Sequence, residues 1–161
     1  MAETEKSYNG IGGWLIMPLL GLFVAPIRMV FLLQRDFSPI FIEGIWNELI
    51  TPGTEVYHPL WAPLVIFKIA GNIIFIIFSL VLLWFFFRKS RFLPKLMVVC
   101  LISNLVFVGG DFLLGNIIMI PAVAKNPDSE SLRELLRSII GAAVWVPYFL
   151  ISKRVKQTFV K

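Results

Sequence analysis

Four long apolar stretches dominate the pattern of hydrophobic and polar positions along the chain. They cover approximately residues 11–33, 62–87, 96–124 and 135–152. A transmembrane helix needs about 20 mostly apolar residues, because the hydrocarbon core of a bilayer is about 30 Å thick. The pattern therefore predicts an all-α, integral membrane four-transmembrane-helix bundle, formed as a single transmembrane domain over residues 1–161.

The first connection between these stretches predicts a further, shorter helix. Ser38-Pro39 is a helix-start signal and Thr51-Pro52-Gly53 is a stop signal. Between them, apolar residues recur at helical spacing, at Phe41, Ile42, Ile45, Trp46, Leu49 and Ile50. We therefore expect a short amphipathic helix over about residues 39–50 that lies on the outer membrane surface. A loop helix that faces a partner protein is the alternative.

The composition agrees with a membrane protein and excludes two other classes. Of the 161 residues, 58% are hydrophobic and 16% are charged, whereas soluble domains average about 45–50% apolar and about 25% charged residues. This apolar content excludes an ordinary soluble domain. It also excludes an intrinsically disordered chain, which needs low hydrophobicity and high charge.

Few residues are available for catalysis or metal binding. Cys100 is the only cysteine and His58 is the only histidine, so an intramolecular disulfide, a thiolate zinc site and a histidine-rich metal site are excluded. The sequence contains no recognisable nucleophile–base pair and no glycine-rich phosphate loop. We therefore predict no catalytic residue, no cofactor and no metal. An enzyme that acts on lipid headgroups through Glu43, Glu48, His58 or Asp111 is the least favoured alternative, because none of these has a diagnostic spacing.

Lysine and arginine are distributed unevenly among the connections. The link between the second and third stretches, RKSRFLPK, and the C-terminal tail, SKRVKQTFVK, are basic and contain no acidic residue. The other two connections contain the acidic residues Asp36, Glu43, Glu48, Glu55, Asp128, Glu130 and Glu134. Because short loops rich in Lys and Arg stay in the cytoplasm, we expect both termini to be cytoplasmic. The basic tail suits an anionic leaflet, so membrane lipids are the predicted partners, and nucleic acid is not.

Three charged residues are predicted to lie inside the hydrocarbon core. Arg28, Lys68 and Asp111 each interrupt one of the first three stretches, and such a charge costs about 2.5–3.5 kcal/mol on insertion scales. A helix rise of 1.5 Å per residue puts all three about 21–24 Å from the cytoplasmic face. We therefore expect one buried polar layer in the outer third of the bundle, with Arg137, near the start of the fourth stretch, at its mouth.

This layer has a structural and a functional interpretation. In both, Asp111 pairs with Arg28 or Lys68 and leaves one cation in excess. In the structural interpretation, which is favoured, the pair neutralises buried charge and fixes helix register, while Lys68 extends towards the membrane surface as the spare cation. In the functional interpretation, the layer is an outward-opening pocket for an anionic group. A proton or ion relay through the buried carboxylate is a third possibility.

Several segments resemble a known bacterial family. These segments are GGWLI at residues 12–16, the Pro18…Gly21…Pro26-Ile27-Arg28 run, TPG…YHPLWAP within residues 51–63, WVPYFL at residues 145–150 and SKRVKQTF at residues 152–159. Together they are similar to the family called domain of unknown function 2569, over nearly the whole chain. The resemblance implies a small four-helix integral protein of the bacterial inner membrane, and it implies no catalytic role.

Two functions are compatible with these observations. The preferred one is a non-enzymatic structural or interaction protein that packs with lipids or with partner proteins, including a possible homo-oligomer. The alternative is a small oligomeric transporter or channel subunit, because the charged layer and a proline-kinked first helix are features of transport sites.

Overall fold

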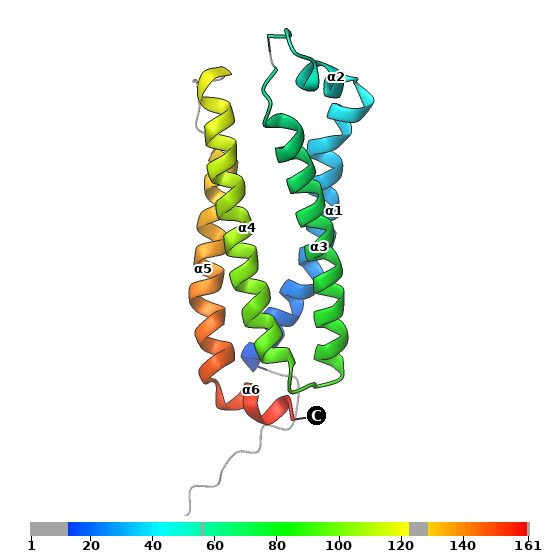
Figure 1. Ribbon diagram of the computed structural model, residues 1–161. Helices are drawn as coiled ribbons and strands as arrows, with labels where there is room; N and C mark the ends of the chain where they lie inside the picture. Colours follow the sequence, from blue (N-terminus) through cyan, green and yellow to red (C-terminus); the bar gives the residue numbers. More distant parts are fainter. Residues whose placement is uncertain (1–12, 56, 123–128, 161) are drawn as a thin grey trace, which may run out of the picture.

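A computed structural model describes residues 13–55, 57–122 and 129–160, and four long helices run side by side in it (Figure 1). The helices are α1 (Ile16–Ile42), α3 (Trp61–Phe87), α4 (Leu93–Ala122) and α5 (Ser129–Ile151). A 3-10 turn (Gly13–Leu15) precedes α1, and two short helices, α2 (Ile45–Ile50) and α6 (Lys153–Thr158), lie at opposite ends of the bundle. Each long helix includes a segment long and apolar enough to cross a membrane. The predicted four-transmembrane-helix bundle is confirmed.

The long helices follow from their composition. In a bilayer the backbone N–H and C=O groups find no water, so an apolar segment must satisfy them internally, and a helix does this. α1 and α3 each contain 27 residues, which corresponds to about 40 Å at the helical rise. Both helices are therefore longer than the hydrocarbon core, and their ends extend into the membrane interface.

The predicted interfacial helix over residues 39–50 is shorter than expected. Helix α1 continues through Pro39 to Ile42, and only Ile45–Ile50 form the separate helix α2. Pro39 removes one backbone donor close to the end of α1, which a long helix tolerates. Gly44 ends the helix instead, because its φ of 76° is in the left-handed region that glycine adopts without steric cost.

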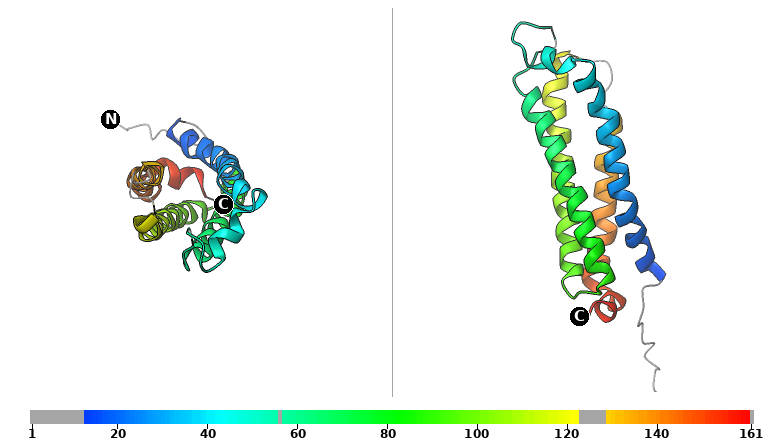
Figure 2. Two further views of the ribbon diagram at one scale, coloured as in Figure 1. Left: turned by 90° about the horizontal axis from the view of Figure 1, so that it is seen from above. Right: turned by 90° about the vertical axis from the view of Figure 1, so that its right-hand side faces the viewer.

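The four long helices form two pairs. α1 packs against α3, α3 against α4, and α4 against α5, whereas α1 and α5 are not closely packed. Seen from above, α1 and α5 are the neighbours that stand apart (Figure 2). We call the α1–α3 pair and the α4–α5 pair the two hairpins. The end with the α3–α4 turn and α6 is called the basic end, and the opposite end is called the α2 end.

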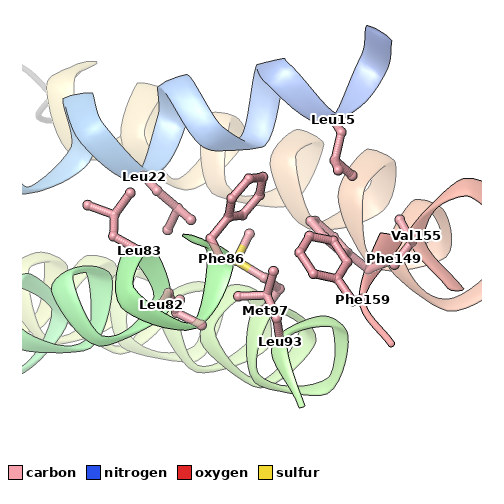
Figure 3. Close-up of a cluster of buried hydrophobic side chains, with 10 residues drawn as sticks. All are labelled: Leu15, Leu22, Leu82, Leu83, Phe86, Leu93, Met97, Phe149, Val155 and Phe159. Carbon is pink, nitrogen blue, oxygen red and sulfur yellow. The ribbon is translucent and has the colours of Figure 1, made fainter. Parts of the chain in front are cut away.

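The hydrophobic core lies towards the basic end. Side chains from the 3-10 turn, α1, α3, α4, α5 and the C-terminal segment converge there (Figure 3), and the cluster consists of Leu15, Leu22, Leu82, Leu83, Phe86, Leu93, Met97, Phe149, Val155 and Phe159. Phe86 is fully buried and meets Phe159 edge-on, with 5.3 Å between ring centroids. This core joins the two hairpins at the basic end.

Helix α6 was not predicted, and it completes this core. Ser152 has an extended backbone and its Oγ accepts a hydrogen bond from the N–H of Val155 at 3.4 Å, so it acts as the N-cap of α6. The turn at Ser152 lays α6 across the basic end (Figure 1). Val155 and Phe159 are buried against the bundle. The signal in the sequence is a serine cap followed by apolar residues at helical spacing.

Candidate functional site

A large cavity lies between the two hairpins. Its volume is about 600 Å³, and all four long helices line it. On α1 the lining runs from Met17, towards the basic end, to Ile40, near the α2 end. The hydrophobic core closes the basic end of the bundle, whereas towards the α2 end the hairpins separate (Figure 1).

The wall of the cavity carries an unusual number of charges for a membrane-spanning region. Four cations and three carboxylates line it: Arg28, Arg35, Lys68, Arg137, Asp36, Asp111 and Glu134. All four residues of the predicted polar layer are among them. Ionisable groups within membrane helices are rare, and they usually face the bundle interior or a water-filled cavity, as they do here.

Lys68 and Asp111 form an ion pair between the hairpins. The Nζ of Lys68, on α3, lies 3.2 Å from Oδ1 of Asp111, on α4, and the Asp111 side chain is 18% exposed. Of the two partners expected for Asp111, the structure brings Lys68 to it. Lys68 is therefore not the spare cation of the layer.

Arg28 has a partner that the sequence did not indicate. Its Nη2 donates to Oε1 of Glu134 at 2.9 Å, and this contact joins α1 to α5. Both side chains are about two-fifths exposed. In the sequence, Glu134 is only one of the acidic residues of a connection, and nothing in the pattern relates it to Arg28.

Arg137 is the remaining cation of the predicted layer. Arg35 pairs with its neighbour Asp36 at 2.7 Å, so each of the three carboxylates in the wall has a cationic partner. Arg137 lines the cavity and makes no ion pair or hydrogen bond with the described residues. Lys68 pairs with Asp111 and Arg28 pairs with Glu134, so neither of the two cations predicted to be in excess is without a partner. The cation of the layer that has no partner among the described residues is Arg137, one helical turn after Glu134.

Uncharged polar side chains extend the polar wall. Ser138, on α5, donates through Oγ to Oδ1 of Asn104, on α4, at 3.2 Å. Asn72, on α3, donates through Nδ2 to the main-chain oxygen of Lys68 at 2.8 Å. All three line the cavity. They add hydrogen-bonding groups close to the ion pairs.

Two guanidinium groups, those of Arg28 and Arg137, are part of this wall. A guanidinium binds carboxylate or phosphate through two parallel N–H···O bonds, and Arg28 already binds the carboxylate of Glu134. Within residues 13–55, 57–122 and 129–160, no group of three His, Cys, Asp or Glu side chains is placed to hold a metal ion.

Four apolar spanning helices around a charged cavity define the class of the protein: it is a polytopic α-helical membrane protein. The chain belongs to the family described as "Protein of unknown function (DUF2569)", which matches residues 8–160. It is also 30% identical to the Escherichia coli K12 protein called "Inner membrane protein YdgK", over 98% of each chain. No solved structure shows significant similarity to it. The family resemblance seen in the sequence is confirmed, and the Escherichia coli relative is named as an inner-membrane protein.

Proposed function

We propose that the protein binds an anionic, membrane-embedded molecule in the cavity between its two hairpins. Arg137 is the observation that carries this proposal, because it lines the cavity without an ionic partner among the described residues. An unpaired charge within the membrane region is costly. An anionic group in the cavity supplies the partner that the described residues do not.

The uncharged part of the wall supports an amphipathic ligand rather than a small inorganic anion. Beyond the charges, the cavity continues along apolar side chains, among them Leu22 on α1, Phe75 on α3 and Leu101 on α4. Ligand sites of this kind combine a mostly apolar lining with a few polar groups that fix orientation. A phosphate or carboxylate group attached to a hydrocarbon chain matches both parts. This proposal makes the protein an interaction protein for lipids and not an enzyme.

Mass spectrometry of the intact protein, released from its membrane in a mild detergent, tests the proposal. We expect an anionic phospholipid to remain bound to the wild type and to be lost from Arg137→Gln. Arg133→Gln is the matched control, because Arg133 is an exposed arginine of the same helix that does not line the cavity. Equal lipid retention by the wild type and Arg137→Gln contradicts the proposal.

The proposed location is a bacterial inner membrane, with both termini in the cytoplasm. The name of the Escherichia coli relative supports the membrane, and the positive-inside rule supports the orientation. Arg88, Lys89 and Arg91 in the α3–α4 turn, and Lys153 and Lys156 in α6, share the basic end of the bundle. Reporter fusions at residue 90 and at the C-terminus test this, and a periplasmic signal from either fusion contradicts it.

A transport role is the second candidate function. It is favoured by the charged cavity. The interrupted helix that often accompanies a transport site is not provided by α1, which continues through Pro26. The closed core at the basic end opposes a continuous pathway in this conformation. Flux of protons and of small anions into proteoliposomes tests it, and the absence of flux with correctly folded protein rejects it. Association with a second copy or with another membrane protein stays a prediction.

A further inference from the structure

The structure points to a lateral access route into the cavity between α1 and α5, and this inference rests on the proposed function. These two helices are not closely packed, although both line the cavity. Viewed down the bundle, α1 and α5 are neighbouring helices that stand apart from each other (Figure 2). Because α1 and α5 are both membrane-spanning helices, that side of the cavity faces lipid.

Large apolar side chains are exposed on both α1 and α5. Ile27 on α1 and Ile140 on α5 are 70% and 63% exposed, as expected for side chains that contact acyl chains. A phospholipid in the adjacent leaflet therefore meets apolar side chains on both helices. Its headgroup is the only part that needs polar partners, and those lie inside the gap.

We propose that the Arg28–Glu134 ion pair closes this route and that the phosphate of an anionic phospholipid replaces Glu134 on Arg28. The pair joins α1 to α5 at 2.9 Å, so it crosses the gap through which the lipid passes. The exchange keeps Arg28 paired, because a phosphate accepts the same two parallel hydrogen bonds as a carboxylate. Arg137, one turn after Glu134, then supplies a second cation to the same phosphate.

The two inter-helix ion pairs thus have different roles. Lys68–Asp111 lies between α3 and α4, which pack against each other, and Asp111 is largely buried. Arg28–Glu134 lies between helices that do not pack closely, and both of its side chains are about two-fifths exposed. The first pair is built into a helix interface, whereas the second is accessible to an incoming headgroup.

Substitutions of Glu134 and of Arg28 are expected to change the lipid affinity in opposite directions. Glu134→Gln removes the carboxylate that competes with the phosphate for Arg28, so the affinity for dihexanoyl phosphatidylglycerol rises about fivefold. In the wild type the partly exposed ion pair must open before the lipid binds, and this requirement lowers the binding-competent population by about the same factor. Arg28→Gln removes the group that binds the phosphate, so the affinity falls. A pair that only stabilises the fold makes both variants change affinity in the same direction.

Isothermal titration calorimetry of the full chain in a nonionic detergent measures these affinities. Glu55→Gln is the charge-matched control, because Glu55 is an exposed carboxylate that does not line the cavity, and we expect less than a twofold change. Dihexanoyl phosphatidylcholine and glycerol phosphate are the other two ligands. They show whether net negative charge and acyl chains are both required, and binding of glycerol phosphate as tight as that of the lipid overturns the lateral route.

A second measurement keeps the proposal testable if Glu134→Gln folds poorly. Spin labels at positions 27 and 140, in a Cys100→Ser background, report the distance between α1 and α5, and we expect it to lengthen when dihexanoyl phosphatidylglycerol saturates the protein. An unchanged distance at saturation, or an unchanged affinity in folded Glu134→Gln, overturns the lateral gate alone. No binding of this lipid to the wild type overturns the proposed function itself.

Discussion

Lys68 and Asp111 face each other across the contact between the two hairpins, with 3.2 Å between Nζ and Oδ1. The main-chain oxygen of Lys68 also accepts a hydrogen bond from Asn72, one turn later on the same helix. The ion pair therefore links α3 to α4 on the cavity wall, where the core of the basic end does not extend. It neutralises two charges that each oppose membrane insertion.

The first prediction concerns the coupling within this pair. Asp111→Asn and Lys68→Gln should each lower the midpoint of thermal unfolding in detergent, because each leaves one charge without its partner. The double variant should lose less stability than the two single variants lose together, and the difference, which is the coupling free energy of the pair, should be about 1 kcal/mol. Purely additive losses contradict a direct interaction, and Glu55→Gln, at an exposed carboxylate outside the cavity, serves as the control.

The second prediction concerns the contact of α3 with α4 at Gly71. A Cβ at this position would overlap the ring of Phe107, so Gly71→Ala forces the aromatic ring to move and costs about 1–3 kcal/mol. Gly115→Ala is the control, because nothing lies within 4 Å of a Cβ there. That variant should be neutral or more stable by up to about 1 kcal/mol, since alanine is the better helix former. Equal unfolding midpoints for the two variants contradict the packing.

The third prediction tests the docking of the C-terminal segment. Phe159→Ala should destabilise the protein by about 3 kcal/mol, because Phe159 is buried in the core against Phe86. Val160→Ala should have little effect, since Val160 is 67% exposed. Limited proteolysis and thermal unfolding measure both. If the two variants behave alike, α6 does not contribute to the core.

The fourth prediction concerns the start of α1. Gly13 has a φ of 58°, and a Cβ there would lie 2.6 Å from Nη1 of Arg154. Gly13→Ala should therefore cost about 1–2 kcal/mol from backbone strain alone. The double variant Gly13→Ala/Arg154→Ala removes the clash between the new Cβ and the Arg154 side chain. It should therefore be destabilised only by the strained backbone at position 13. An unchanged unfolding midpoint in Gly13→Ala shows that this turn is not required for stability.

The sequence by itself determined the number and type of the spanning elements. A continuous apolar run of about 20 residues satisfies its own backbone in lipid as a helix, so the pattern of four such runs predicts four helices. It also identified Arg28, Lys68, Asp111 and Arg137 as unusual, because the cost of a membrane-embedded charge is a property of the residue and its depth.

Only the tertiary structure decided how those charges are distributed. Periodicity gives the depth of a residue along its own helix but not which helices are neighbours, so it left Asp111 with two possible partners and gave Arg28 no link to Glu134. The same limit applies to small residues: Gly71 meets a neighbouring helix, whereas Gly21 has nothing within 4 Å of a Cβ. Pairing, close packing and the cavity all depend on the relative position and rotation of separate helices, and contacts between distant segments set these.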